Sequence, residues 1–341
     1  MPPAPITAVI INYNYARFVG DAVRACLTQS MPFQQVIVVN DGSTDDSLSV
    51  LGGFDGIEVL DIDNRGQTGA SRVGLSQATA PYVYFLDADD YPEARMSQVV
   101  SGFCDGRNVK IQFQLRGVDE AGRDLRSVFP TFPFGYTSDG MRQDNQRRGF
   151  HVCPPSSGNV YLRSALEALD LTIVDQYDAL DGAVALVMPE IGPVATISEP
   201  LACYRVHGGS TSQYAVPTSE IMQRDLVRHR RRWQEAVRLT PGLCVPPPDT
   251  TEYEWELHFL SEALGDGRPR PATTWQYASH LVTSRERPRR KALLVAWVVA
   301  VALAPARRRR AMVAARRSSA NRSGPLNAFL DAVLGGRNRG Q

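Results

Sequence analysis

The sequence contains little cysteine and no apolar run of the length that membrane-spanning helices usually have. Its five cysteines are odd in number, and no two of them have the spacing of a zinc site or a redox pair. Because no secretory signal is recognisable at the N-terminus, we expect buried thiols in a reducing cytoplasm. The apolar stretch 292–304 (ALLVAWVVAVALA) has 13 residues, whereas an ordinary spanning helix needs about 20.

Internal repeats and low-complexity tracts are also absent. The 341 residues are 43% hydrophobic and 21% charged, and glycine and proline are spread along the chain. This composition argues against a solenoid and against a disordered protein. The length allows a sizeable core, and it predicts one large domain with an appendage.

Strand-like and helix-like segments alternate over the first hundred residues. The predicted strands are 8–11, 36–39, 57–62, 82–86, 109–115 and 194–204. The predicted helices are about 18–29, a segment ending near 78, 220–239 and 252–264. Ser43 or Thr44 is the candidate cap of another helix after the second strand. Near-continuous apolar strands alternating with helices predict an α/β fold with a mostly parallel sheet.

Polar residues follow each of the first four predicted strands. The clusters are Asn12–Asn14, Asn40–Ser43, Asn64–Gly66 and Asp87–Asp90. Ligands of parallel sheets bind beyond the carboxyl ends of the strands, although ordinary loops are also polar. In the last cluster, three carboxylates repel one another. A solvated turn accommodates them, and so does a divalent cation bound through one or two carboxylates and substrate phosphates.

Four segments carry a family resemblance in their order and spacing. They are Ala8–Asn14 (AVIINYN), Val36–Asp45 (VIVVNDGSTD), Asn64–Gly74 (NRGQTGASRVG) and Tyr82–Asp90 (YVYFLDADD). Together they closely resemble the nucleotide-binding half of family 2 glycosyltransferases, which are inverting enzymes with the GT-A fold. The resemblance covers roughly residues 6–215. It implies transfer of a sugar from a nucleotide-diphosphate sugar, with a UDP-sugar favoured, and a requirement for Mn²⁺ or Mg²⁺.

The resemblance also implies residues that bind the donor. Asp41 matches the acid that contacts the nucleotide base, and Arg72 matches a basic residue near the base or diphosphate. Asp87 resembles the first acid of the D-x-D motif, near the ribose. The predicted donor-binding set also includes Asn12 and Asn14.

Two positions depart from the family pattern. Asn40 stands where the family usually has an acid, and Val73 stands where it often has asparagine. Neither lies at the predicted metal site. They leave the class intact and weaken the assignment of uracil as the base.

The same resemblance implies two ligands for the cation. Asp89 resembles the metal-binding acid of the D-x-D motif. The segment Tyr204–Ser212 (YRVHGGSTS) resembles a Y-R-x-H-x-x-S motif whose histidine completes the metal shell or binds the diphosphate. His207 is therefore the second predicted metal ligand, with Arg205 suited to phosphate beside it. A structural histidine is the alternative.

Asp181 is the predicted general base, because displacement at an anomeric carbon requires a group that accepts the proton of the acceptor hydroxyl. The family usually has an acidic pair at the start of a helix and a glycine about eleven residues later. Matching that glycine to Gly192 places Asp181 on the second acid and Leu180 on the first. Asp175 and Asp178 are rival bases, and a carboxylate favoured only by the helix dipole is the structural alternative.

The C-terminal part of the chain is strongly basic. From Arg285 onward, 14 Lys and Arg residues stand against two acids, a net charge of +12, so the remainder carries −11. Basic segments on both sides of 292–304 favour contact of the tail with an anionic membrane surface, and 312–317 and 326–334 could add amphipathic pieces. A packed helix with a solvated basic rim is the alternative. Interleaved aromatic residues are missing, so we expect no binding of nucleic acid.

The predicted organisation follows from these features. The ranges are 1–215 for a GT-A catalytic domain (1–100 nucleotide-binding, 101–215 acceptor half), 216–284 for a helical extension and 285–341 for a basic, partly apolar tail. The expected partners are a nucleotide-sugar donor and a glycan or lipid-linked acceptor, and the expected location is the cytoplasmic face of the plasma membrane. A catalytically silent nucleotide-sugar-binding scaffold is the main alternative. A nucleotidyltransferase is disfavoured because Asn12–Asn14 replaces a Gly-rich basic loop.

Overall fold

The computed structural model describes residues 2–176, 178–208, 217–244, 247, 251–283 and 288–317. Parts of two predicted features, 209–212 of the histidine motif and 318–341 of the basic tail, lie outside the described residues. The chain divides into two compact units. Unit 1 comprises Met1–Arg142, His151–His207 and Arg232–Val245, and unit 2 comprises Gln143–Phe150, Gly208–Arg231 and Pro246–Gln341. The predicted boundaries at 215 and 284 stay predictions.

Unit 1 is built on a nine-stranded sheet with the order β3-β2-β1-β4-β8-β6-β9-β5, and β7 pairs with β6. The strands are β1 (Ala4–Asn12), β2 (Phe33–Asp41), β3 (Glu58–Ile62), β4 (Tyr82–Asp87), β5 (Tyr91–Pro92), β6 (Lys110–Asp119), β7 (Asp124–Phe129), β8 (Asn159–Leu162) and β9 (Val194–Val206). Strands β3, β2, β1 and β4 are parallel, whereas β8 runs antiparallel to β4 and to β6. The predicted α/β class is confirmed, with a parallel N-terminal half followed by a mixed half.

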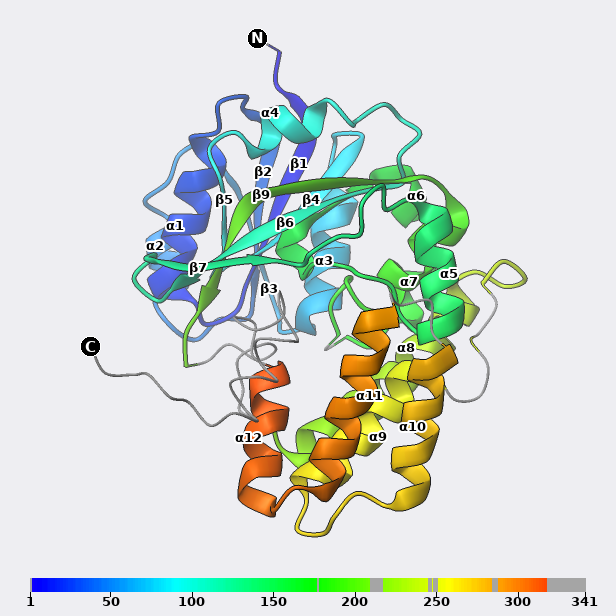
Figure 1. Cartoon of the computed structure of the whole chain (residues 1–341). Coiled ribbons are helices and arrows are strands. Elements are labelled where there is room, and N and C mark those ends of the chain that lie inside the picture. The colour runs from blue at the N-terminus through cyan, green and yellow to red at the C-terminus, as the bar shows by residue number, and fades with distance from the viewer. Residues whose placement is uncertain are drawn as a thin grey trace. The chain divides into compact units, whose positions relative to one another are not determined.

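Strands β1, β2 and β4 are mostly buried on both faces, which explains their near-continuous apolar sequences, whereas the edge strand β3 is largely exposed. Helices α1 (Ala16–Leu27) and α3 (Gly66–Gln77) cover opposite faces of this part of the sheet (Figure 1). Gly74 lets α3 approach closely, because a Cβ atom there would lie 2.3 Å from Cγ1 of Val9 and 3.3 Å from Cγ2 of Val39. The strands therefore hold α3 at a fixed height over the sheet.

The remaining helices of the N-terminal part are short. They are α2 (Ser47–Leu51), α4 (Met96–Ser101), α5 (Ser138–Arg148), α6 (Arg163–Glu167), α7 (Ala183–Ile191) and the 3₁₀ turns η1 (Ser156–Gly158) and η2 (Leu171–Ile173). Ser43 and Thr44 do not cap α2, which begins later, after Asp46. Both residues bond Asn14 instead: the Asn14 backbone N–H donates to Ser43 Oγ, and the Thr44 N–H donates to Asn14 Oδ1. The polar turn after β2 therefore connects to the turn after β1 and does not cap a helix.

Unit 2 is helical. Its elements are the first part of α8 (Ser219–Leu239), then α9 (Glu252–Leu264), α10 (Pro271–Thr283), α11 (Pro288–Leu303) and α12 (Ala306–Arg317), of which α9 to α12 lie side by side (Figure 1). Thr251 begins α9 with a capping box that includes Glu254. The apolar stretch 292–304 falls within α11 and the residue after it, and one face of the helix packs in the core of this unit through Leu294, Trp297, Val298 and Val301. Within the described residues, no helix has the length and apolar character needed to cross a membrane.

Candidate active site

The carboxyl ends of β1 and β2 are joined by side-chain hydrogen bonds. The buried Asn12 donates from Nδ2 to Asn40 Oδ1 at 2.9 Å and to Ser43 Oγ at 3.2 Å. Asn14 has a φ of 57°, a left-handed conformation that asparagine tolerates better than most residues. Its backbone and side chain both bond the turn after β2. Asn12 and Asn14 therefore connect the carboxyl ends of β1 and β2, where the sequence predicted that the nucleotide-sugar donor binds.

Asp41 lies at the end of β2, and only 2% of the residue is exposed. One carboxylate oxygen accepts the backbone N–H of Arg65 at 2.7 Å, immediately before α3. Burial raises the pKa of Asp41, while hydrogen bonds from the backbone at Arg65 and Gly66 oppose the rise. The next residue, Gly42, has a φ of +71°, and a Cβ atom there would lie 2.7 Å from the backbone N of Asn64. Only glycine fits this close approach of the two polar turns.

Asp87 ends β4 and lies among other carboxylates. Its Oδ1 accepts a hydrogen bond of 2.7 Å from Nε2 of Gln67, in the first turn of α3. Burial, together with the negative charges of Asp89 and Asp181, raises the pKa of Asp87 to about 8. Asp181 precedes α7, more than ninety residues away in sequence. The structure therefore brings the predicted base within electrostatic range of the predicted D-x-D motif.

Asp89 and His207 are in direct contact. Oδ2 of Asp89 and Nε2 of His207 are 2.9 Å apart, and 16% of the Asp89 side chain and 1% of the His207 side chain are exposed. The ring of Tyr15 meets the imidazole edge-on at 5.6 Å, and the ring of Phe18 lies 5.0 Å away, centroid to centroid. These two aromatic residues, from the start of α1, fix the imidazole against the carboxylate. Burial raises the pKa of Tyr15 to about 12, with further contributions from Asp89 and Asp87.

Arg205 organises the loop that carries Asp89, a role that the sequence did not indicate. Its guanidinium is 4% exposed and donates to the backbone carbonyl oxygens of Asp89 at 2.9 Å and Glu120 at 2.7 Å. It also pairs with Asp21 at 3.1 Å and stacks on the ring of Phe18 at 4.7 Å. Sequence comparison suggested phosphate as its partner. The Y-R-x-H motif was the sequence signal that could have indicated this role, because it places Arg205 two residues before His207, the predicted metal ligand.

The two rivals of Asp181 have structural partners. Asp178 is 4% exposed and accepts from Nε of Arg232 at 2.6 Å, in an ion pair between the loop and α8. The backbone N–H of Asp175 donates to Oε1 of Glu235 at 3.2 Å. Leu180, at the position of the first acid, packs in the hydrophobic core of unit 1. These contacts hold the segment that leads into Asp181.

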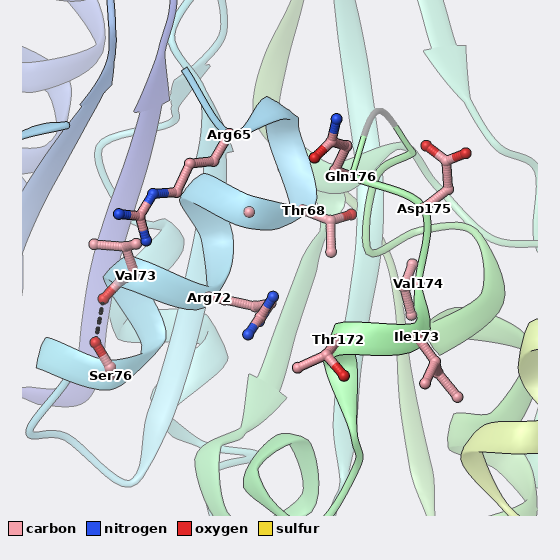
Figure 2. Close-up of a pocket in the computed structure, with 11 residues that line it drawn as sticks. Arg65, Thr68, Arg72, Val73, Ser76, Thr172, Ile173, Val174, Asp175 and Gln176 are labelled. Atoms are coloured by element: carbon pink, nitrogen blue, oxygen red, sulfur yellow. Dashed lines mark hydrogen bonds between the residues drawn. The ribbon is translucent and has the colours of Figure 1, made fainter. Parts of the chain in front are cut away.

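Arg72 lines a cavity of about 770 Å³ between α3 and the segment 172–176 (Figure 2). Arg65 also lines the cavity, and Thr172 and Asp175 contribute to the opposite wall. Thr68 anchors this wall, because its backbone N–H donates to the carbonyl oxygen of Gln176 at 3.1 Å. Within the part of the chain that the structure describes, no hydrogen bond or ion pair joins Arg72 to Asp87, Asp89 or His207. The predicted site residues thus fall into a carboxylate–histidine cluster and a cavity with two arginines, linked through α3.

The residues of the cluster are suitable for a divalent cation. Carboxylate oxygen and imidazole nitrogen are both ligands of Mn²⁺, and Mg²⁺ accepts one or two carboxylates when phosphates supply further oxygens. The raised pKa of Asp87 reflects burial first, and then the negative charges of Asp89 and Asp181, which a cation would offset. Across the described ranges, no group of three or more His, Cys, Asp or Glu side chains is arranged to hold a metal by itself. Asp89 and His207 could therefore hold a cation only together with further ligands from a substrate or solvent.

Comparisons with known proteins agree with this geometry. The sequence profile of "Glycosyl transferase family 2" matches residues 7–169. An uncharacterised glycosyltransferase of Nostoc sp. is 31% identical over 224 residues, which are 63% of this chain and 69% of that protein. Another, from Haemophilus influenzae, is 30% identical over 98 residues, and the match covers 26% of this chain and 37% of that protein.

A solved structure shares the fold. The mannosyltransferase PcManGT from Pyrobaculum calidifontis, solved in complex with GDP-Man and Mn²⁺, is 16% identical, with a TM-score of 0.50. The match covers 98% of this chain and 87% of that one. The predicted GT-A type of α/β fold, with its helical C-terminal extension, is confirmed.

Proposed function

The chain belongs to glycosyl transferase family 2, and on this premise we propose that it transfers a sugar from a nucleotide-diphosphate sugar to a glycan or lipid-linked acceptor, with inversion and with a divalent cation. The observation that carries the proposal is the contact of Asp89 with His207 at 2.9 Å, beside Asp87 and within electrostatic range of Asp181. This arrangement supports a cation ligand set and a proton acceptor at the same end of the parallel strands.

Asp89 and His207 would hold the cation. When bound with the donor, Mn²⁺ or Mg²⁺ would neutralise negative charge on the diphosphate leaving group. The rings of Tyr15 and Phe18 keep the imidazole in place, and Arg205 fixes the backbone of Asp89. The protein thereby supplies two oriented ligands before the donor binds, which reduces the reorganisation required at the moment of reaction.

Asp181 is the proposed base. The acceptor hydroxyl oxygen attacks the anomeric carbon from the face opposite the diphosphate, the bond from that carbon to the leaving oxygen breaks, and the carboxylate takes the hydroxyl proton. Inversion follows from a single displacement. The ion pair of Asp178 with Arg232 supports Asp181 over this neighbour, because breaking a buried ion pair costs several kcal/mol.

The donor is proposed to lie along the ends of β1, β2 and β4. Asn12, Asn14 and Asp41 would contact the nucleoside, Asp87 the ribose, and Arg72 the base or diphosphate across the cavity with Arg65. A UDP-sugar remains favoured by the family resemblance. Because the solved structure with the same fold contains GDP-Man, GDP-sugars are also tested as donors.

The acceptor is proposed to be a glycan or a lipid-linked sugar. A location at the cytoplasmic face of the plasma membrane belongs to this proposal and rests on the basic C-terminal region. An acceptor held at the membrane would place the growing glycan within reach of a peripheral enzyme.

The test is release of nucleoside diphosphate from a panel of UDP-, GDP- and other nucleotide sugars, with Mn²⁺, with Mg²⁺ and with a chelator. We expect turnover of one donor that depends on the cation. Asp89→Ala should abolish it, because the variant loses one of two protein ligands. Asp55→Ala is the matched control, since this aspartate is exposed and lies in the turn before β3.

Three results would change the proposal. Turnover that is unaffected by chelator and by Asp89→Ala would overturn the metal assignment. Donor binding in calorimetry without turnover would indicate that the acceptor is missing from the assay. Neither binding nor turnover across the panel would overturn the transferase proposal. A protein without catalytic activity is then the alternative, for which Leu180 at an acidic position of the family is the specific observation.

A further inference from the structure

Two helix connections of unit 2 lie at the same end of this unit (Figure 1). One is the α9–α10 connection, residues 265–270, and the other runs from the end of α11 into the first turn of α12, residues 303–310. We call the two together the arginine tip. Arg309 joins them: its guanidinium donates to the carbonyl oxygens of Ala263 at 2.6 Å, Gly267 at 2.7 Å and Ala304 at 3.4 Å.

Arg309 is the structural arginine of this region. It is 2% exposed, and its donors satisfy carbonyl groups at the C-terminal ends of α9 and α11. Burial lowers its pKa, and the positive charges of Arg310 and Arg268 lower it further. Arg310 and Arg268 are therefore close enough to the buried Arg309 to affect its pKa. Capping of the helix ends by Arg309 does not by itself require these additional arginines.

The other arginines of the tip are exposed. They are Arg268, Arg270, Arg307, Arg308 and Arg310. Arg270 pairs with Glu262 and Arg310 pairs with Asp266. Arg268, Arg307 and Arg308 form no ion pair with any residue in the ranges that the structure describes. The tip therefore presents three exposed arginines that pair with no acidic side chain of the described residues.

The tip also contains an exposed apolar side chain. Leu303 is 66% exposed, whereas Leu294 and Val301 of the same helix are buried in the core of unit 2. The apolar residues of 292–304 thus serve mainly as a packing face, and the last of the large ones is left in solvent in the connection that also carries Arg307 and Arg308. Exposed leucine flanked by unpaired arginines is typical of a surface that meets lipid.

We propose that the arginine tip is a docking surface for an anionic lipid bilayer, with Leu303 entering the interface and Arg268, Arg307 and Arg308 contacting phosphate headgroups. The proposal deepens the peripheral location given above and rests on the proposed function for its biological setting. The proposed membrane contact is thus made by the arginine tip, while one face of α11 stays packed in the core of unit 2.

The chemistry of the tip favours lipid over nucleic acid. Recognition of single-stranded nucleic acid combines cations with exposed aromatic rings on which bases stack. The tip residues 265–270 and 303–310 contain no aromatic side chain. A bilayer needs only cations at headgroup height and an apolar side chain that reaches the acyl boundary.

The test is sedimentation of the full chain with vesicles of phosphatidylcholine alone or mixed with phosphatidylglycerol, in the absence of donor. We expect binding to the mixed vesicles only, weakened by salt. The double variant Arg307→Glu and Arg308→Glu should bind at least tenfold more weakly, since each cation near an anionic surface strengthens binding about fivefold. Arg107→Glu with Arg123→Glu is the charge-matched control on exposed sites of unit 1.

A second pair of variants isolates the apolar contact. Leu303→Ala should weaken vesicle binding severalfold, whereas Val282→Ala, at a 57% exposed site on α10, should leave it unchanged. Equal binding of wild type and the double variant would overturn the proposal, as would binding to a single-stranded oligonucleotide that displaces the vesicles. Donor turnover without vesicles should be the same in every tip variant, so loss of docking and failure of the transferase proposal give different results.

Discussion

At the scale of single residues, two aspartates three positions apart have different environments. Asp178 is buried in an ion pair with Arg232. Asp181 precedes α7, and its negative charge helps to raise the pKa of Asp87. A Cβ atom at Gly182, the residue after Asp181, would lie 2.7 Å from Nε of Arg232 and 3.0 Å from Oδ2 of Asp178. The ion pair of Asp178 with Arg232 therefore leaves no room for a larger residue directly after Asp181.

Substitution separates these two roles. We expect Asp181→Asn to lower kcat about 100-fold or more while donor affinity changes little, because the proton acceptor is lost. Asp178→Asn should instead reduce the free energy of unfolding by about 3 kcal/mol, since it leaves Arg232 without its partner. Kinetics and urea unfolding of both variants check this. A stable, inactive Asp178→Asn protein would reverse the assignment.

Arg205 offers a residue-scale test of positioning. In Arg205→Lys, one ammonium cannot reproduce the bonds that a planar guanidinium makes to Asp89, Glu120 and Asp21. We expect a severalfold increase in the Mn²⁺ concentration for half-maximal activity, because the backbone of the Asp89 loop is released. Arg116→Lys, at a surface ion pair with Glu93, is the control. A lower melting temperature with unchanged Mn²⁺ dependence would show that Arg205 is merely structural.

At the scale of elements, α3 connects the parts of the site. The backbone just before it bonds Asp41, its first turn bonds Asp87 through Gln67, and its outer face lines the cavity with Arg72. The position of the helix over the sheet therefore sets several distances at once. Gly74 controls that position, because it meets Val9 and Val39.

The expected effect of Gly74→Ala follows from this packing. The added methyl group would lie 2.3 Å from Val9 Cγ1, so the helix must move outward or the valine must leave its rotamer. Overpacking of this kind costs about 1 to 3 kcal/mol. Gly52→Ala, where the nearest atom is 3.5 Å away and φ is −62°, should have little effect. Urea unfolding of both variants measures the difference, and equal stabilities would contradict the packing argument.

At the scale of the whole molecule, the five cysteines are free and resist ionisation. Burial raises the pKa of Cys244 from 9.0 to about 11, and burial raises the pKa values of Cys104 and Cys203 to about 12. Below pH 9 the thiols are protonated in both the folded and the unfolded chain. Above pH 9 the unfolded chain loses its protons first, so the free energy of unfolding falls as pH rises toward the folded-state pKa values.

This linkage predicts the alkaline behaviour of the protein. Between pH 9 and about 11, Cys244 should contribute a loss of about 1 kcal/mol per pH unit. Urea midpoints measured across this range should fall less steeply in Cys244→Ala than in wild type. Cys244→Ser should share the shallower slope even where its stability at pH 7 differs, because neither variant titrates. Identical slopes in all three proteins would show that this thiol does not carry the effect.

The sequence by itself determined the parallel half of the sheet and the polar strand ends, because buried parallel strands must be apolar along their whole length and the turns after them cannot be. It also determined the family, through four segments whose spacing is the spacing of β1, β2, α3 and β4. Tertiary structure decided the contacts that depend on long-range packing. Only the fold could pair Asp89 with His207, occupy the guanidinium of Arg205, distinguish Asp178 from Asp181 and bury one face of 292–304 while leaving Leu303 in solvent. The physical reason is that a side chain's neighbours across the fold, which sequence distance does not specify, set its charge, burial and partners.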